Sequence, residues 1–159
     1  MNYLFLLFLI QLPTTFLFSQ NKNYKNDLFY GGSIGYFNQN GNFGKIGGFV
    51  AIASDNKSVN IFKIDVNANI TGMQHQFKII PEVGLAYYIL HDKLAYTGIF
   101  IETEITPYTF TPKAGISLFS ILDLGIGYGT DLKTKNNYKT IDGLQISIGF
   151  NLPFNFNIY

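Results

Sequence analysis

The sequence predicts an all-β protein: an eight-stranded antiparallel up-and-down transmembrane β-barrel that follows an N-terminal signal peptide. Three observations predict this fold. Apolar and polar residues alternate in successive runs, the number of runs is even, and charged residues are scarce. Charged residues make up 13% of the 159 residues and aromatic residues 17%, whereas a typical soluble domain has about 25% charged residues. The chain therefore has little surface suited to water.

The composition also limits the number of domains and the kinds of chemistry. A chain of 159 residues suits a single domain. Eleven Lys and Arg against ten Asp and Glu give a net charge of +1, which is too balanced for a nucleic-acid-binding surface. The absence of cysteine excludes a disulfide framework, a thiolate metal site and a cysteine nucleophile. We therefore expect no nucleic-acid partner and no chemistry based on sulfur.

Residues 1–19 predict a cleaved export signal. Their apolar run, from Tyr3 to Ile10, is followed by Gln11 and Pro13, and it is shorter than the roughly 20 residues of a spanning helix. We expect cleavage after Ser19 or Gln20, which leaves residues 20–159 as one barrel domain. An uncleaved N-terminal anchor helix is the alternative, because the segment before the apolar run has no Lys or Arg.

The remaining chain divides into eight predicted strands, separated by clusters of Asn, Asp, Gly and Lys. Their expected ranges are 28–37, 44–54, 59–71, 76–90, 94–105, 109–120, 123–131 and 140–152. Pro81 and Pro112 lie inside two of these runs and predict β-bulges near the outer rim, because proline donates no ladder hydrogen bond.

The orientation of the alternating faces decides whether the barrel lies in a membrane or in water. Small residues occupy much of the polar face, as a narrow lumen requires: Gly31, Ser33, Gly35, Gly125, Gly127, Gly129, Gly143, Ser147 and Gly149. Aromatic residues lie near the ends of the runs, as in interfacial girdles: Tyr30, Tyr36, Phe37, Phe77, Tyr87, Tyr108, Phe110, Tyr128 and Phe150. These patterns favour an apolar face toward lipid.

The C-terminal run supports the same class. Leu144, Ile146, Ile148, Phe150 and Leu152 alternate with polar or small residues. This run resembles the closing strand of bacterial outer-membrane β-barrel proteins, and with the signal peptide the resemblance covers the whole chain. The resemblance implies a small eight-stranded barrel, located in the outer membrane after export through the periplasm, with outer-membrane lipids and the barrel-assembly machinery as partners. The chain departs from the pattern because the alternation continues past Pro153 to a terminal tyrosine.

Charged residues on the expected inward face predict a structural cluster in the lumen. Its members are Lys45, Lys63, Asp65, Lys78, Glu82, Glu102, Glu104 and Lys113. If the connection at Pro107 is tight and pairs Ile105 with Phe110, Glu102 lies opposite Lys113, and we then expect a salt bridge between them. Buried charges are tolerated when they are paired. The alternative is that Glu82 and Glu102 form an acid pair for catalysis or proton passage.

The two histidines do not form a recognisable site. His75 and His91 are expected at opposite rims, so they share no metal, and His75 with Thr71 or Thr109 is only a weak candidate for a catalytic group. We expect no catalytic residue, no cofactor and no metal.

The expected role is structural, or surface interaction with an extracellular or cell-envelope protein through the loops Asn38–Phe43 and Leu132–Lys139. The alternatives are a lipid-modifying barrel hydrolase or acyltransferase, and a soluble periplasmic barrel that binds an apolar ligand between inward-facing Phe62, Ile64 and Val66.

Overall fold

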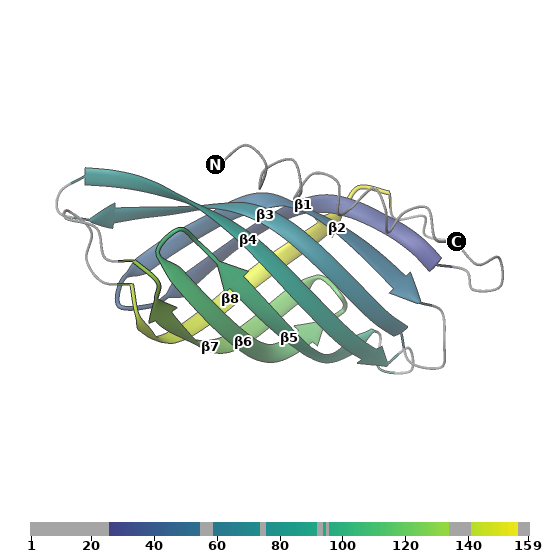
Figure 1. Ribbon diagram of the computed structural model, residues 1–159. Coiled ribbons are helices and arrows are strands. Elements are labelled where there is room, and N and C mark those ends of the chain that lie inside the picture. The colour runs from purple at the N-terminus through teal and green to yellow at the C-terminus, as the bar shows by residue number, and fades with distance from the viewer. Residues whose placement is uncertain are drawn as a thin grey trace, which may run out of the picture.

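The structure is a closed antiparallel barrel of eight strands in sequence order (Figure 1). It is a computed structural model that describes residues 26–54, 59–73, 76–91, 94, 96–133 and 141–155. The predicted signal peptide, residues 1–19, lies outside the described residues. No helix among the described residues is long and apolar enough to cross a membrane.

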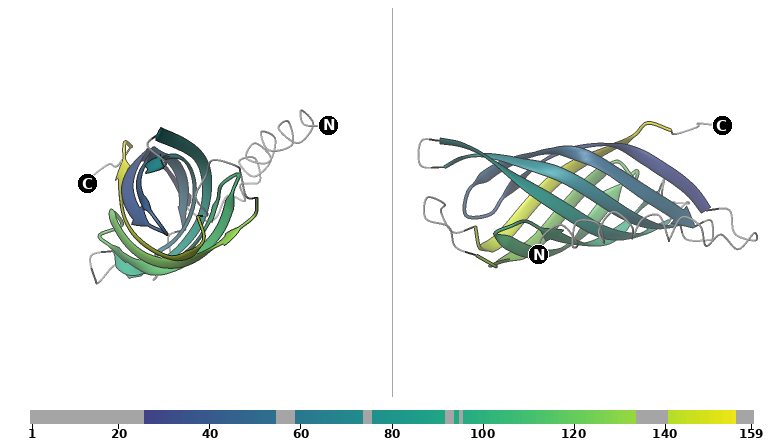
Figure 2. Two further views of the ribbon diagram at one scale, coloured as in Figure 1. Left: turned by 90° about the vertical axis from the view of Figure 1, so that its left-hand side faces the viewer. Right: turned by 45° about the horizontal axis from the view of Figure 1, so that its top comes forward.

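Each strand pairs with its sequence neighbours, and β1 pairs with β8 to close the barrel. The left-hand view of Figure 2, close to the barrel axis, shows the strands arranged in a ring. The strands are β1 (Asn26–Asn38), β2 (Asn42–Ser54), β3 (Val59–Met73), β4 (Gln76–His91), β5 (Thr97–Ile105), β6 (Thr109–Leu118), β7 (Leu122–Asp131) and β8 (Gly143–Pro153). The predicted fold class, eight antiparallel strands in an up-and-down barrel, is therefore confirmed.

The two ends of the barrel differ in what they carry. One end carries the start of β1, the end of β8 and the connections 55–58, 92–96 and 119–121, and we call it the turn end. We call the opposite end the loop end; it carries the connections 39–41, 74–75, 106–108 and 132–142. The predicted loop Asn38–Phe43 is wrong in its limits. The connection between β1 and β2 is only residues 39–41, and Phe43 belongs to β2 and is buried.

Three predicted strand limits are also wrong, each at or next to a residue with positive φ. The fifth strand begins at Thr97, after Tyr96 with φ 55°, and the sixth ends at Leu118, before Phe119 with φ 57°. The last strand begins at Gly143, with φ 97°. Left-handed backbone cannot continue a strand ladder, and the alternating pattern carries no sign of it at Tyr96 and Phe119.

The predicted bulges at the two prolines are absent. The register of β3 with β4 is continuous through the pair Ala68 and Pro81. Pro81 lies beyond the end of the β4 ladder with β5, which starts at Val83, so its missing N–H leaves no ladder bond unmade. Pro112 lies where the β6–β7 ladder skips residues without changing register.

Side chains alternate strictly between the outside and the lumen. In β3, for example, Val66 is 61% exposed whereas Asp65 and Asn67 are 2% and 6% exposed. The prediction that Phe37 belongs to an aromatic girdle is wrong, because its side chain points inward and is buried. It stacks on Phe43 with 4.6 Å between ring centroids.

The lumen has three layers along the barrel. Near the loop end is an apolar plug formed by Phe37, Phe43, Met73, Ile80 and Ile141. A polar middle layer follows, and a second apolar layer, formed by Ala86, Tyr88, Leu90 and Phe100, lies toward the turn end.

Two strand glycines, Gly31 on the lumen side of β1 and Gly72 on the outer face of β3, give a testable difference. A Cβ at Gly31 would lie 2.8 Å from the Leu152 carbonyl carbon and 2.7 Å from the Phe49 ring, whereas a Cβ at Gly72 meets nothing within 4 Å. We expect Gly31→Ala to lower the free energy of unfolding by about 1–3 kcal/mol because the neighbouring strand must shift. Gly72→Ala should change it by less than about 0.5 kcal/mol. Urea unfolding of both variants measures this, and equal effects would contradict the described packing.

Candidate functional site

The centre of the polar layer is a carboxylate that accepts hydrogen bonds from three strands. Glu104 on β5 accepts from Lys45 on β2 at 2.5 Å and from Lys113 on β6 at 2.6 Å. The amide of Gln145, on β8, donates to its other oxygen at 2.8 Å. Glu104 is 2% exposed, so its charge is compensated by ammonium groups and an amide rather than by bulk water.

Two further carboxylates share these lysines. Lys45 also pairs with Glu82 at 2.5 Å, and Lys113 pairs with Glu102 at 2.8 Å. The salt bridge between Glu102 and Lys113 expected from the sequence is therefore present, and the two residues are direct partners in the β5–β6 register. Glu82 also accepts from Asn69 at 2.6 Å. Because Glu82 and Glu102 each have their own lysine, the arrangement favours a structural role over an acid pair.

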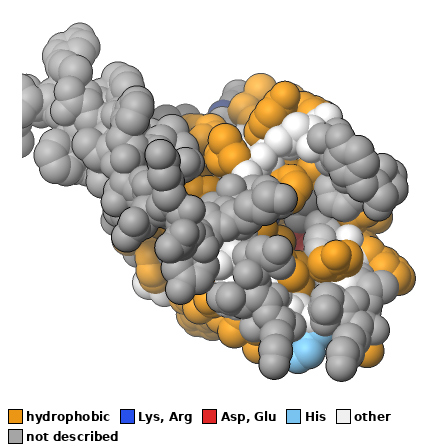
Figure 3. Space-filling view, turned by 90° about the vertical axis from the view of Figure 1, so that its right-hand side faces the viewer, with side chains coloured by type: hydrophobic (Ala, Val, Ile, Leu, Met, Phe, Trp, Pro, Cys, Tyr) orange, Lys and Arg blue, Asp and Glu red, His pale blue; other side chains and the backbone are white. Residues whose placement is uncertain are grey.

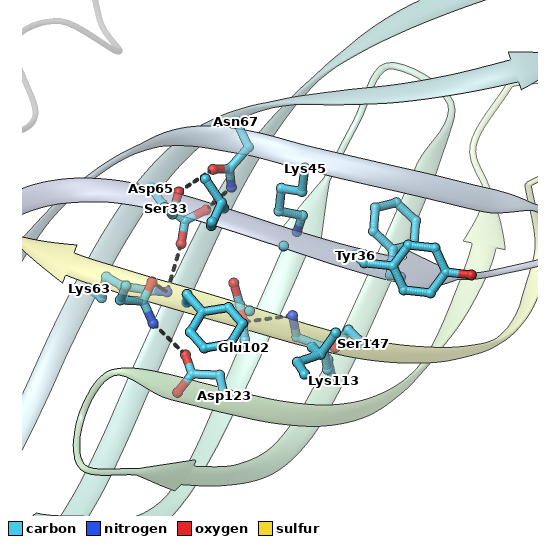
Figure 4. Close-up of a pocket in the computed structure, with 17 residues that line it drawn as sticks. Ser33, Tyr36, Lys45, Lys63, Asp65, Asn67, Glu102, Lys113, Asp123 and Ser147 are labelled. Carbon is cyan, nitrogen blue, oxygen red and sulfur yellow. Dashed lines mark hydrogen bonds and ion pairs between the residues drawn. The ribbon is translucent and has the colours of Figure 1, made fainter.

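A second group of polar side chains lies on the turn-end side of this centre. Lys63 is 3.3 Å from a carboxylate oxygen of Asp65 and donates to the side-chain oxygen of Asn151 at 3.3 Å. Asn151 in turn donates to Asp123 at 2.7 Å, and the Tyr88 hydroxyl donates to the same oxygen at 2.8 Å. Figure 4 shows Lys63, Asp65 and Asp123 of this group around one small cavity, which Asn151 also lines.

The structure brings together seven of the eight residues predicted for the lumen cluster. Ion pairs join Lys45, Glu82, Glu102, Glu104 and Lys113 in one group and Lys63 with Asp65 in a second. The Asn67 amide connects the two groups, because it donates to both Asp65 and Glu82. Lys78 lies apart from them, only half-buried near the loop end, where it donates to Gln76 at 2.6 Å.

One acidic member of the lumen is absent from the predicted cluster. Asp123 begins the predicted strand 123–131, and the structure places it on β7, where it faces the lumen and is 8% exposed. A signal in the sequence could have found it. Asp123 lies two, four and six residues before Gly125, Gly127 and Gly129, which were assigned to the inward face, and alternate residues of a strand share a face.

The described middle layer therefore has more acids than bases. Its acids are Asp65, Glu82, Glu102, Glu104 and Asp123, and its bases are Lys45, Lys63 and Lys113. The predicted balance of four cations and four anions is therefore wrong, because Lys78 lies near the rim and Asp123 joins the cluster. The formal excess is two negative charges.

Hydrogen-bond acceptors are also in excess. Among the described side chains, four carboxylate or amide oxygens and one hydroxyl are buried without a hydrogen-bond partner in the protein; they belong to Asp65, Asn69, Asp123, Gln145 and Ser117. The Asp65 oxygen is the one that forms the ion pair with Lys63. A cavity of about 40 Å³ lies against Asp65 and Asp123, and a water needs roughly 10–15 Å³ measured in this way. The layer can thus hold ordered water but offers no space for a larger solute.

The excess acid predicts that one carboxylate is dispensable. One oxygen of Asp123 accepts both of its hydrogen bonds, and the other has no partner in the protein. We expect Asp123→Asn to cost less than about 1 kcal/mol, because it removes an uncompensated charge while one acceptor oxygen is kept. Equilibrium unfolding of the variant measures this. A loss above about 3 kcal/mol would contradict the described charge excess.

Histidine and metal chemistry receive no geometric support from the described residues. His91 is exposed at the turn-end limit of β4, and His75 lies outside the described residues. Within the part of the chain that the structure describes, no three His, Asp or Glu side chains are placed to hold a metal ion.

No family model, curated protein or solved structure matches this chain. Its functional interpretation therefore rests on its own residues and their geometry.

Proposed function

We propose that this protein is an integral outer-membrane β-barrel without a catalytic role, which acts structurally or through contacts made at its loop end. One observation carries the proposal. Across the described residues, every outward-facing position of the eight strands is free of Lys, Arg, Asp and Glu. A barrel in water would have charged side chains on that face, whereas a hydrocarbon environment excludes them.

The outward side chains also match a lipid-facing surface in kind. Large aliphatic residues are exposed on every strand; Val66, Ile101 and Ile126, for example, are each more than 60% exposed. Aromatic side chains mark the ends of this belt, with Tyr36 and Tyr128 toward the loop end and Tyr30 and Phe119 toward the turn end. Figure 3, which views the turn end, shows hydrophobic side chains gathered around it. Such girdles are typical of membrane interfaces.

The soluble alternative requires the opposite orientation. It places Phe62, Ile64 and Val66 in the lumen, but these side chains are 45%, 38% and 61% exposed on the outside. This geometry supports the membrane proposal.

The filled lumen favours a structural or surface role over solute passage. The apolar plug and the ion-paired layer fill it, as in other eight-stranded barrels, whose interior is just wide enough for side chains. At the loop end, the connections 39–41, 74–75 and 106–108 are short, and 132–142 is the longest. We therefore assign contact with an extracellular or cell-envelope protein to the connection 132–142, and contact with outer-membrane lipids to the belt.

Cell fractionation tests the proposal. Outer membranes, inner membranes and the soluble periplasm are separated from expressing Gram-negative cells, and the membranes are washed with alkaline carbonate. We expect the protein in the outer-membrane fraction after the wash. Recovery in the soluble periplasm without detergent would overturn the proposal.

A further inference from the structure

The lumen contains a larger cavity at the turn end, which we call the turn-end pocket. Its volume is about 350 Å³, compared with about 40 and 10 Å³ for the two cavities of the lumen's interior. Ligand pockets commonly have volumes of about 300–1,000 Å³ and mostly apolar walls. The wall of the turn-end pocket fits that description, because it is formed largely by Phe49, Ala51, Ala53, Ile61 and Leu90.

The polar side chains at the floor of the pocket already contact other groups of the protein. Lys63 and Asn151 form part of it, and they are hydrogen-bonded to each other. The Lys63 ammonium also pairs with Asp65 and lies 5.5 Å from the centre of the Tyr88 ring. The polar layer directly beneath the floor has a formal excess of two negative charges, so the floor disfavours a carboxylate and favours the apolar end of a ligand.

The mouth of the pocket is formed by residues in an unfavourable backbone conformation. Tyr96, Phe119 and Ser120 line it and have φ values of 55°, 57° and 57°. The β6–β7 turn closes with a hydrogen bond from Ile121 to Leu118, and turns with two positive φ values normally use Asn-Gly. Such conformations persist where the surrounding structure holds them, and they cluster at functional sites.

The two strained turns hold each other at this mouth. The Ser120 N–H donates to the Tyr96 carbonyl at 3.1 Å, and the Ser120 hydroxyl donates to the same oxygen at 3.4 Å. Connections far apart in the sequence are thereby joined around one opening. An apolar cavity with a fixed mouth is a preformed site, which lowers the ordering cost of binding.

We propose that the turn-end pocket binds one unbranched hydrocarbon chain of a fatty acid, with the methyl end on the floor and the carboxylate at the mouth. The volume of about 350 Å³ lies near the lower end of the range for ligand pockets, which suits one hydrocarbon chain rather than a lipid with several chains. This inference goes beyond the proposed function and does not depend on it, since the pocket lies inside the barrel whatever surrounds the outer face.

Photolabelling of the full chain tests the proposal. The protein is reconstituted in bilayers of a diacyl phospholipid with a twelve-carbon fatty acid that carries a diazirine at its methyl end. After illumination, the labelled residues are mapped by peptide mass spectrometry. We expect label on inward-facing Tyr88 and Leu90, in addition to label on the lipid-facing surface. Moving the diazirine next to the carboxylate should shift the inward label to Phe119 and Ser120.

Two comparisons separate binding in the pocket from general partitioning. Ala53→Phe fills the pocket and should remove at least nine-tenths of the Leu90 label, whereas Ala68→Phe, on the outward face of β3, should leave it unchanged. Excess unlabelled dodecanoic acid should likewise remove the Leu90 label and spare the outer label, which provides the test if Ala53→Phe does not fold. Absence of inward label, or an inward label that survives both treatments, would overturn the proposal.

Discussion

Replacement of Lys113 by methionine should lower the free energy of unfolding by about 3–5 kcal/mol, the cost of leaving a buried charge without its partner. Lys113 pairs with both Glu102 and Glu104. Glu104 keeps Lys45 in the variant, whereas Glu102 loses the one ion pair it makes among the described residues. The substitution also adds to an existing excess of acid, while methionine preserves most of the lysine's packing volume.

The control for this prediction is Lys78→Met. Lys78 is half-buried near the loop end, so we expect its replacement to change the free energy of unfolding by about 0–1 kcal/mol. Urea unfolding of the protein folded into lipid bilayers compares the two variants.

A double variant shows whether the loss comes from the charge of Glu102. Adding Glu102→Gln to Lys113→Met removes the stranded carboxylate, so it should recover part of the stability with a coupling energy of about 0.5–3 kcal/mol. Strictly additive effects would show that the Glu102–Lys113 pair does not act as described.

The lumen shows what alternation can and cannot predict. Alternation has a period of two, so it assigns Asp65, Glu82 and Glu104 to one face without knowledge of the turns. The tight turn at Pro107 adds the register that pairs Glu102 with Lys113. Alternation does not state how far along the barrel a residue lies, which is why Lys78 was grouped with residues from which it is separated.

Apolar residues on the inward face were harder to predict. Phe37, Phe43 and Phe100 point into the lumen, although their hydrophobicity suggests the lipid face. These three side chains belong to the two apolar layers, which fill the lumen toward its ends. Which inward-facing residues lie near the ends depends on the length and stagger of all eight strands. The turn-end pocket was missed for the same reason: its wall combines β2, β3 and β4 with two turns of left-handed backbone.

The central claim is that the apolar outer face meets lipid, and the cost of an arginine at two depths tests it most directly. Val66 and Gly72 face outward on β3, Val66 in its middle and Gly72 near its loop-end limit. We expect Val66→Arg to lower the free energy of unfolding in bilayers by about 2–4 kcal/mol and Gly72→Arg by about 0–1 kcal/mol, because the penalty for arginine falls from the bilayer midplane to its surface. Small and equal losses for both variants would show that the outer face meets water and would contradict the membrane account.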